Sequence, residues 1–330
     1  MKKIFAFIIF SLISTAFALN CKICKKEING RYMKDKHNNV FCSEKCFAET
    51  APKCTLCKKA CSKGIYTFMK KPYCSKKCLE QISKCANCDT PSPQIRIIIN
   101  TDGTQMLFCP SCAGNPKCYF CSLPYKTRKL ADGRHICQTC RKTAVSSKQQ
   151  ILSRLKYVRK KLNQLYGFDM NHYIELIVLD LNELERESGG IYQPAGGFRI
   201  ALMRYNYEIS EKKARRGRNV RKLQNEKCRI FILNNTPRDL LDDALAHELT
   251  HDYLRHNAGK ISDLSVEEGF AETVASQFNK AVKKPHLNKR KEANNDPVYG
   301  GGYRKISKLL KQKGFKKTVE YVKSFATPVI

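Results

Sequence analysis

The sequence predicts an α+β fold, with small cysteine-rich units followed by a domain that combines a short sheet with a helical lobe. Three observations lead to this prediction. Sixteen of the 18 cysteines fall into paired clusters between residues 21 and 140. Three strand-like runs follow, and no helix lies between them at the spacing of a β-α-β unit. A long helix with two histidines four residues apart comes after the last run.

The first 18 residues, MKKIFAFIIFSLISTAFA, have the pattern of a secretory signal peptide. Lys2 and Lys3 form a positive start, an apolar run covers 4–13, and residues 16–18 read A-F-A, which fits a cleavage site. The run is too short for a membrane-spanning helix, which needs ~20 apolar residues. We therefore expect residues 1–18 to be removed and the remaining chain to be exported, to the periplasm or outside the cell.

The chain is strongly basic. It has 61 Lys and Arg against 29 Asp and Glu, a formal net charge of +32. Such an excess favours acidic partners, among them nucleic acid and anionic lipid. The charge is spread over the whole chain and is not gathered in one arm, so a solvated lysine-rich surface explains it as well. Nucleic acid is the less favoured partner.

Residues 19–145 are predicted to form four zinc knuckles. The segment 21–47 is repeated by 54–79, each with C-x2-C, a basic hairpin-like middle and a second cysteine pair. Two further units have the same form, and two sulfur pairs suit a closed tetrahedral zinc site. The predicted structural ligands are Cys21, Cys24, Cys42, Cys46, Cys54, Cys57, Cys74, Cys78, Cys85, Cys88, Cys109, Cys112, Cys118, Cys121, Cys137 and Cys140.

Disulfides are the alternative, because exported chains meet an oxidising environment. The repeated C-x2-C and C-x3-C spacing favours zinc, since cysteines so close in a knuckle rarely bond each other well. His37 could replace one sulfur in the first unit, although it also fits a polar hairpin position. Cys61 and Cys228 stand outside the clusters. Units this small lack an apolar core, so metal binding would supply much of their folding energy.

Residues 146–330 are predicted to form a second domain. It begins with an amphipathic helix at 146–166, which Gly167 ends. Three strands are then expected at 173–181, 197–205 and 228–235. A basic insert, 207–227, lies between the last two strands and is expected to be a mobile loop.

The next predicted helix runs to about Asn257 and contains the motif HELTH. Thr236 is expected as its N-cap and Pro237 as its first helical residue. His247 and His251 lie one turn apart, so both imidazoles can bind the same ion. Glu248 stands beside the first ligand, where it can take a proton from metal-bound water. The H-E-x-x-H pattern is typical of zinc peptidases, but alone it recurs by chance.

A third ligand is predicted in SVEEGFAET, where Glu268 would return towards the two histidines at the start of a second helix. Glutamate followed by Gly-Phe-Ala resembles the gluzincin peptidases, and that resemblance implies Glu268 as the third zinc ligand. Glu267 and Glu272 are the alternatives. Ser265 and Glu268 also fit a capping box, in which Glu268 would merely hold the start of the helix.

The order of the parts is similar to that of the plant LIM-domain peptidases that limit organ growth, and of their bacterial relatives. The matching stretches include DGRHICQTC, IELIVLDLNEL, ILNNTPRDLLDDALAHELTHDYLR, VEEGFAETVA and DPVYGGGYRKISKLLKQKGFKKTVEYV, and the similarity covers roughly residues 85–327. The resemblance implies that His247 and His251 bind zinc, that Glu248 is catalytic, and that protein substrates are cleaved.

In that family ubiquitin activates the peptidase. This chain lacks ubiquitin-interacting motifs before the LIM-like part and carries a signal peptide instead. Ubiquitin is therefore a doubtful activator here, and the knuckles are expected to dock proteins.

The expected function is an exported zinc metallopeptidase with one catalytic zinc and about four structural zincs. Tyr299 or Tyr303, on either side of a triple glycine, would donate a hydrogen bond to the oxyanion. A non-catalytic zinc-knuckle adaptor and a nucleic-acid-binding protein are the alternatives.

Overall fold

The computed structural model describes residues 19–35, 37–61, 65–68, 70–82, 84–92, 94–189, 199–213 and 219–327. The expected signal peptide, 1–18, lies outside the described residues. Side chains between 207 and 225 are also not described. None of the described helices is long and apolar enough to cross a membrane.

The chain divides into two compact units. The first contains residues up to Ile97 together with Leu107–Gly114, and the second contains Ile98–Met106 and Asn115–Ile330. Three cysteine clusters belong to the first unit, while the fourth cluster belongs to the second. The contacts therefore place the division earlier in the chain than the boundary at residue 145 expected from the sequence.

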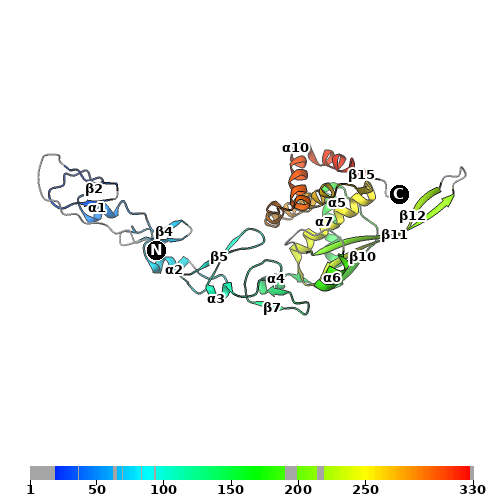
Figure 1. Ribbon diagram of the computed structural model, residues 1–330, viewed down its shortest axis with the longest axis horizontal. Coiled ribbons are helices and arrows are strands. Elements are labelled where there is room, and N and C mark those ends of the chain that lie inside the picture. Colours follow the sequence, from blue (N-terminus) through cyan, green and yellow to red (C-terminus); the bar gives the residue numbers. More distant parts are fainter. Residues whose placement is uncertain are drawn as a thin grey trace. The chain divides into compact units, whose positions relative to one another are not determined.

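Each cysteine unit consists of a short hairpin followed by a short helix (Figure 1). The hairpins are β1 (Met33–Lys34) with β2 (Val40–Phe41), β3 (Tyr66–Phe68) with β4 (Lys71–Tyr73), β5 (Arg96–Ile99) with β6 (Gln105–Phe108), and β7 (Thr127–Lys129) with β8 (His135–Cys137). The helices are α1 (Glu44–Ala48), α2 (Lys76–Ile82), α3 (Pro110–Ala113) and α4 (Gln138–Lys142).

The second unit is built around a three-stranded sheet in the order β10-β12-β11. Its strands are β10 (Ile174–Leu179), β11 (Ala201–Lys213) and β12 (Asn219–Leu233). β10 runs parallel to β12, whereas β11 runs antiparallel to it. The α+β class is thus confirmed, with a mixed sheet.

Helices cover one face of this sheet. They are α5 (Lys148–Tyr166), α7 (Arg238–Asn257), α8 (Leu264–Ala281) and α10 (Gly302–Lys323), with α10 interrupted by a kink at Gly314. Shorter elements complete the unit: α6 (Leu181–Glu187), α9 (Asn288–Glu292), the 3-10 turn η1 (Pro285–Leu287), the π-helical turn η2 (Pro297–Gly301), and the paired two-residue strands β9 (Ala144–Val145) with β13 (Thr236–Pro237) and β14 (Lys260–Ile261) with β15 (Ala326–Thr327).

The two faces of the sheet have different neighbours, because successive residues of a strand point to opposite sides. Ile230 and Ile232 pack with the helices in one core. Phe231 and Leu233 pack in another core with α6 and the fourth cysteine unit. The fourth unit is thereby a structural part of the second unit, and it covers the sheet face that the helices leave open.

Arg134 ties the fourth unit to the end of β12. Its side chain is buried, forms an ion pair with Asp132 at 2.6 Å, and donates from Nη1 to the backbone oxygen of Asn234 at 3.1 Å. A buried charge is tolerated only when it is paired and hydrogen-bonded, and both conditions are met here.

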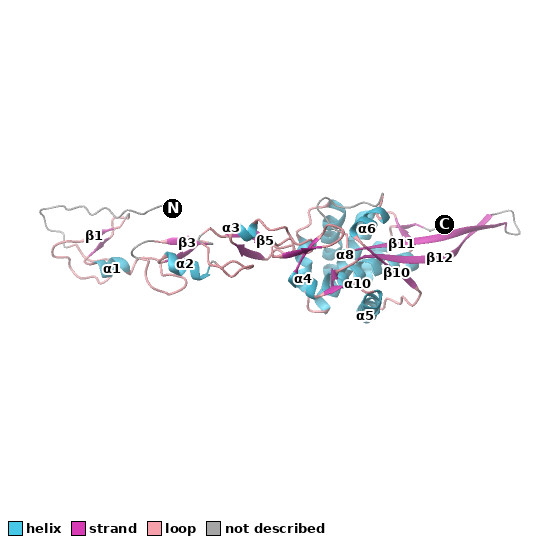
Figure 2. Cartoon of the chain, turned by 90° about the horizontal axis from the view of Figure 1, so that it is seen from below, coloured by secondary structure: helices cyan, strands magenta, loops and turns pink. Residues whose placement is uncertain are grey.

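The basic insert at 207–227 is a correction to the sequence prediction, because it is not a loop over its described length. β11 and β12 continue through it as an antiparallel hairpin, with pairs from Glu208↔Gln224 to Lys213↔Asn219. Figures 1 and 2 show the two strands extending beyond the rest of their unit. The antiparallel ladder pairs the backbone groups of both strands whatever their side chains are, so a charged sequence can also form it.

The predicted start of the motif helix is also wrong. Pro237 is the N-cap of α7 and makes no side-chain cap bond. Thr236 instead belongs to β13, and its hydroxyl donates to the backbone oxygen of Leu233 at 2.6 Å. The pairing of β13 with β9 fixes the chain at this point, so a side-chain cap is not needed.

Candidate metal centres

α7 and α8 bring three of the predicted ligands together. His247 and His251 lie one turn apart on α7, and their Nε2 atoms are 3.1 Å from each other. Glu268 on α8 places Oε2 3.1 Å from Nε2 of His247 and 3.6 Å from Nε2 of His251. A tetrahedral zinc site with bonds of ~2.0–2.1 Å has ligand atoms ~3.3–3.4 Å apart. The three atoms therefore have the spacing of one face of such a site.

Glu268 satisfies a further test of fit. Its Oε2 is buried and has no hydrogen-bond partner, although buried polar atoms are normally paired. Burial raises the pKa of this carboxyl group, but the imidazoles of His251 and His247 outweigh that effect and hold the pKa of Glu268 well below its usual range. An ionised, buried oxygen that faces two imidazole nitrogens is suited to a cation.

The pKa values of the two histidines are shifted by the same cluster. Burial lowers the pKa of each imidazole, but the carboxylate of Glu268 outweighs it and raises the pKa of both His247 and His251. Protons and a metal ion compete for the same nitrogens. The cluster attracts positive charge, and a metal ion could supply it in place of protons.

Glu267 and Glu272, the alternative ligands, lie behind the histidines. Oε1 of Glu267 is 3.2 Å from Nδ1 of His251. Oε1 of Glu272 is 3.8 Å from Nδ1 of His247. Carboxylates in this position fix the orientation of a metal-binding imidazole and raise its basicity. The geometry therefore favours Glu268 as the third ligand.

The alternative role of Glu268 as a helix cap is not supported. The N-cap of α8 is Asp263, whose carboxylate accepts from the backbone N–H groups of Ser265 and Val266. Glu268 lies in the second turn, beyond the free N–H groups of the helix start.

Glu248 points to the edge of the sheet. Its Oε2 accepts a hydrogen bond of 3.0 Å from the backbone N–H of Met203 on β11. β11 is the outer strand on this side of the sheet. The contact holds one oxygen of the carboxylate against β11, and Glu248 directly follows His247 on α7.

Tyr299 lies over the cluster. Its ring is stacked with that of His247, with 6.4 Å between centroids and 18° between planes. Burial, and next the nearby carboxylate of Glu268, raise the pKa of Tyr299 well above its usual range, so its phenol keeps its proton. Tyr303, the other candidate, is buried and its hydroxyl is 3.1 Å from Oγ of Ser276. Tyr303 is thus a packing residue.

Glycines allow α8 and the start of α10 to touch, and this contact fixes the turn that carries Tyr299. A Cβ on Gly269 would lie 2.4 Å from the backbone of Gly302. A Cβ on Gly302 would lie 2.1 Å from the backbone oxygen of Ser265. Neither distance is physically tolerable, so the helices must separate if either residue gains a side chain.

We expect Gly269→Ala to lower stability by about 1–3 kcal/mol, because overpacking against backbone cannot be relieved by a rotamer change. Gly301→Ala is the matched control, since its Cβ would meet only an ordinary contact of 3.7 Å. Unfolding in urea would measure the free energy of unfolding of both variants. Equal stability of the two variants would refute the close-packing argument.

A buried lysine supports the carboxylate behind His247. Nζ of Lys291, on α9, contacts Oε2 of Glu272 and lies 3.1 Å from Oδ1 of Asp243. Burial lowers the pKa of Lys291, but the two carboxylates outweigh it and raise that pKa. Asn279 donates to the same oxygen of Asp243 at 2.7 Å. The sequence analysis missed this lysine, because nothing in a lysine-rich chain marks one lysine as buried.

Lys291→Met should destabilise the protein by about 3–5 kcal/mol, because it removes the buried cation between the carboxylates of Asp243 and Glu272 and leaves Asp243 with the more distant Arg290, at 3.9 Å. Lys289→Met, two residues earlier on the same helix and exposed, should have little effect. Thermal and urea unfolding would be compared for both variants. A loss in Lys291→Met no larger than that of the control would show that the buried ion pair contributes nothing.

The sixteen predicted knuckle cysteines form four clusters of four. In each cluster the sulfur atoms lie within 4.8 Å of one another. The hydrogen-bonded sulfur pairs are separated by 3.4 to 3.9 Å. Zinc–sulfur bonds of ~2.3 Å place tetrahedral sulfurs ~3.8 Å apart, whereas a disulfide needs ~2.05 Å. The four clusters could each hold a zinc ion, and they do not have disulfide geometry.

One local conformation recurs in all four clusters. The residue after the second cysteine is left-handed, with φ of 60° at Lys25, 61° at Lys58, 57° at Asp89 and 59° at Ser122. Its N–H bonds the carbonyl of the first cysteine. This tight turn points two sulfurs the same way. His37 stands outside the first cluster, which is complete with four sulfurs.

In three of the clusters the first cysteine has a thiol that loses its proton readily. Burial raises the pKa of Cys21, Cys54 and Cys85, but backbone N–H groups that donate to their sulfurs outweigh it and lower each pKa to about 6. In the last two clusters, Cys109 and Cys137 are also helix N-caps. Their sulfurs accept from the backbone N–H groups of Cys112 and Cys140, respectively.

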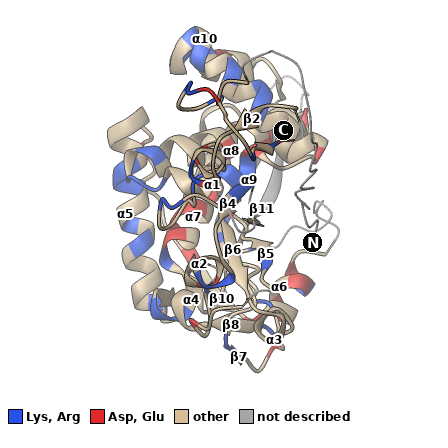
Figure 3. Cartoon of the chain, turned by 90° about the vertical axis from the view of Figure 1, so that its left-hand side faces the viewer, with Lys and Arg blue, Asp and Glu red and all other residues tan. Residues whose placement is uncertain are grey.

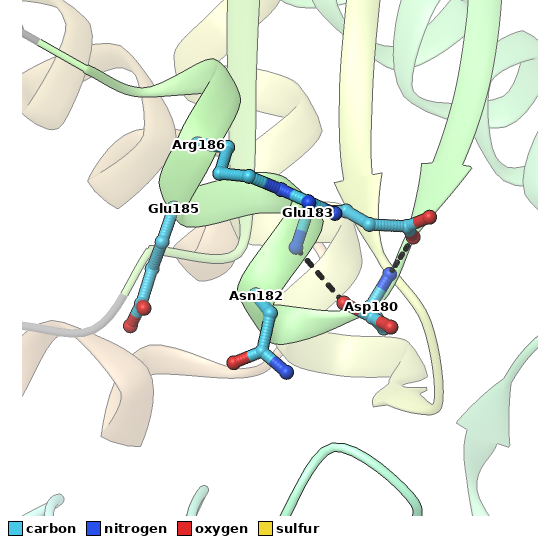
Figure 4. A pocket seen from close by; sticks show the side chains of 5 residues that line it. All are labelled: Asp180, Asn182, Glu183, Glu185 and Arg186. Carbon is cyan, nitrogen blue, oxygen red and sulfur yellow. Dashed lines mark hydrogen bonds between the residues drawn. The ribbon is translucent and has the colours of Figure 1, made fainter.

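A surface hollow at α6 lies apart from these centres. Figure 4 shows its lining residues, Asp180, Asn182, Glu183, Glu185 and Arg186. Asp180 and Glu183 form a capping box, in which each side chain accepts from the other residue's backbone N–H. The polar groups here hold the start of a helix, so the hollow is no competing candidate for an active site.

No protein-family model matches the chain, and no curated protein matches it. The family resemblance seen in the sequence therefore stays a prediction, and the function has to be argued from the site itself.

Proposed function

We propose that the protein is a zinc metallopeptidase of the gluzincin type, in which His247, His251 and Glu268 hold the ion. The observation that supports this most strongly is the spacing of three ligand atoms at 3.1 to 3.6 Å, with the buried Oε2 of Glu268 left without a hydrogen-bond partner. Glu248 beside this cluster adds a base, which a purely structural site would not need.

The ion, when bound, would polarise the scissile carbonyl and lower the pKa of water to ~7. Glu248 would accept the proton of the attacking water and deliver it to the leaving nitrogen. Tyr299 keeps its proton and lies over His247, so its hydroxyl would donate to the oxygen that becomes negative. Glu267 and Glu272 would hold the two imidazoles in register.

The outer edge of β11 is the proposed substrate platform. Met203 presents its N–H from this edge to Glu248, so a peptide lying along the strand passes the base. Extended peptides bind to exposed strand edges through main-chain hydrogen bonds. The substrates would therefore be proteins with accessible extended segments.

The cysteine clusters of the first unit would serve as protein-docking modules with structural zinc. We further propose that the chain is exported through its N-terminal 18 residues. The similarity to the LIM-domain peptidases is part of this proposal, while ubiquitin remains a doubtful activator.

A non-catalytic adaptor is the main rival, and a nucleic-acid binder is the second. The second is favoured by charge alone: Figure 3 shows Lys and Arg on both α5 and α10, and α5 contains no acidic residue. Binding to nucleic acid would weaken steeply with salt. A salt titration of RNA and DNA binding therefore separates this rival from protein docking.

The proposal is tested by identifying new protein N-termini. Wild-type protein and Glu248→Gln would each be incubated with a protein extract, and the new termini would be labelled and sequenced by mass spectrometry. We expect a set of cleavage sites produced by the wild type and absent with the variant. Identical sets would support the adaptor.

A further inference from the structure

A second cluster of side chains that could bind a metal ion joins two residues of α7 to a histidine that precedes β10. Nε2 of His172, in the segment before β10, is 3.0 Å from Oδ1 of Asp252. Nδ1 of His256 is 3.4 Å from the same oxygen. Ligand atoms of these three residues all lie within 4.8 Å of one another. The two distances to Oδ1, 3.0 and 3.4 Å, are close to the ~3.3–3.4 Å edges expected for zinc with nitrogen and oxygen ligands.

This cluster is separate from the proposed catalytic centre. His247 and His251 form one pair four residues apart, and Asp252 and His256 form another, five positions further along the helix. Five residues at 3.6 per turn correspond to a rotation of about 140°. The two pairs therefore face nearly opposite sides of α7.

Asp252 provides the second, independent observation. Its side chain is fully buried, and Oδ2 has no hydrogen-bond partner. Oδ1 is crowded: besides the two histidines it is 3.1 Å from the hydroxyl of Tyr205 and 3.8 Å from the sulfur of Cys228. A buried carboxylate with one orphaned oxygen is unfavourable as a simple hydrogen-bond acceptor, and a cation would compensate it.

The imidazole of His256 has a carboxylate on its far side. Nε2 is 3.8 Å from Oε2 of Glu226, so a proton on Nε2 faces a negative charge. That tautomer leaves the lone pair of Nδ1 for a ligand bond, in place of the 2.9 Å contact with the backbone oxygen of Asp252. A carboxylate behind a metal-binding histidine is the usual supporting arrangement.

The surroundings allow an ion to enter. The side chains of His172 and His256 are 34% and 36% exposed, in contrast to Asp252 at 0%. Water could therefore complete the coordination from the exposed side. Two arginines are close, but Arg255 pairs with Glu226 at 3.5 Å and Arg159 donates to the backbone oxygen of His172. Burial lowers the pKa of Arg159 and the charge of Asp252 opposes this, so that guanidinium already offsets part of the charge of Asp252.

We propose that His172, Asp252 and His256 form a second metal site, which binds Zn²⁺ or a similar borderline cation through two imidazoles and one carboxylate. Imidazole ligands favour zinc, nickel and copper over magnesium or calcium. The ion would join the C-terminal half of α7 to the segment that leads into β10, and so tie the helix to the sheet.

The test counts zinc ions in the full-length, reduced protein after dialysis against low-micromolar free Zn²⁺. Four chains are compared by elemental analysis: wild type, His256→Gln, Glu268→Gln and the double variant. We expect each single variant to hold one zinc ion fewer than the wild type, and the double variant two fewer. His286→Gln, at an exposed histidine of η1, is the control and should lose none.

Two further variants separate ligation from hydrogen bonding. Tyr205→Phe removes a hydrogen bond to Asp252 but no ligand, so it should keep the full zinc count. His172→Asn should lose the same single ion as His256→Gln. If circular dichroism shows that His256→Gln is unfolded, His172→Asn is used for the test in its place. Added zinc should also raise the unfolding temperature of Glu268→Gln but not that of the double variant.

The proposal is overturned if His172→Asn and His256→Gln both hold as much zinc as the wild type. It is also overturned if the double variant loses no more than Glu268→Gln alone. If Glu268→Gln loses no ion while His256→Gln loses one, the second site stands and the proposed catalytic centre fails.

Discussion

Glu248→Gln is expected to reduce peptide-bond hydrolysis by roughly 10²–10⁴-fold, the usual contribution of a positioned acid–base group. The amide has nearly the shape of the carboxylate but cannot accept the proton of water. It can still accept a hydrogen bond from the N–H of Met203, the contact that holds Glu248 at the edge of β11. The fold and the zinc content should therefore be unchanged.

The rate would be measured on a protein substrate identified from the new N-termini. Zinc content and circular dichroism would be recorded on the same samples. Glu185→Gln, the same change at an exposed position of α6, is the matched control and should retain full activity. A fully active Glu248→Gln would mean that the HELTH helix is not a peptidase helix.

Glu268→Gln should instead remove the metal. A neutral amide oxygen is a poor substitute for the ionised carboxylate whose Oε2 faces both imidazoles. We expect loss of one zinc ion per chain together with loss of hydrolysis, while the four cysteine clusters keep their ions. The contrast with Glu248→Gln is diagnostic, because one change removes the base and the other removes the ion.

Glu267→Gln is the control for this ligand assignment. Glu267 precedes Glu268 on the same helix but contacts Nδ1 of His251, the nitrogen turned away from the cluster. Its loss should weaken zinc binding by roughly 10–100-fold and leave the site filled when zinc is in excess. If Glu267→Gln loses the ion and Glu268→Gln keeps both ion and activity, the third ligand is Glu267 and not Glu268.

Local signals in the sequence predicted the elements that are determined locally. The helix expected at 146–166 is α5, which begins two residues later because Ser147 and Gln150 form a capping box. Gly167 ends it in the left-handed conformation, with φ of 67°. The cysteine clusters could also be predicted, because the spacing of cysteines along the chain determines which sulfur atoms can come close together.

Elements that depend on contacts with distant parts of the chain could not be predicted from the sequence. The strands of the basic insert pair with each other across a hairpin, and no short-range pattern signals this in a charged sequence. Threonine is a common helix N-cap, but Thr236 pairs with β9, about 90 residues earlier in the chain, in a small sheet. Tertiary contacts outweighed a local preference in both cases.

The candidate site divides in the same way. His247, Glu248 and His251 share one helix, so the motif alone placed them. Glu268 was predicted from the resemblance of its surroundings to gluzincin peptidases, and the packing of α8 against α7 favours it over Glu267 and Glu272. The second cluster was missed although Asp252 and His256 have the spacing of ligands on one helix face, because its third member, His172, is 80 residues away from Asp252.

The central claim is that one zinc ion lies between α7 and α8, held by His247, His251 and Glu268 with Glu248 beside its open position. Anomalous X-ray diffraction at the zinc edge, on crystals of the purified protein, tests it most directly. The account predicts an anomalous peak at ~2.0–2.2 Å from Nε2 of both histidines and from a carboxylate oxygen of Glu268. A zinc-saturated crystal with peaks at the cysteine clusters and none between the two helices would contradict it.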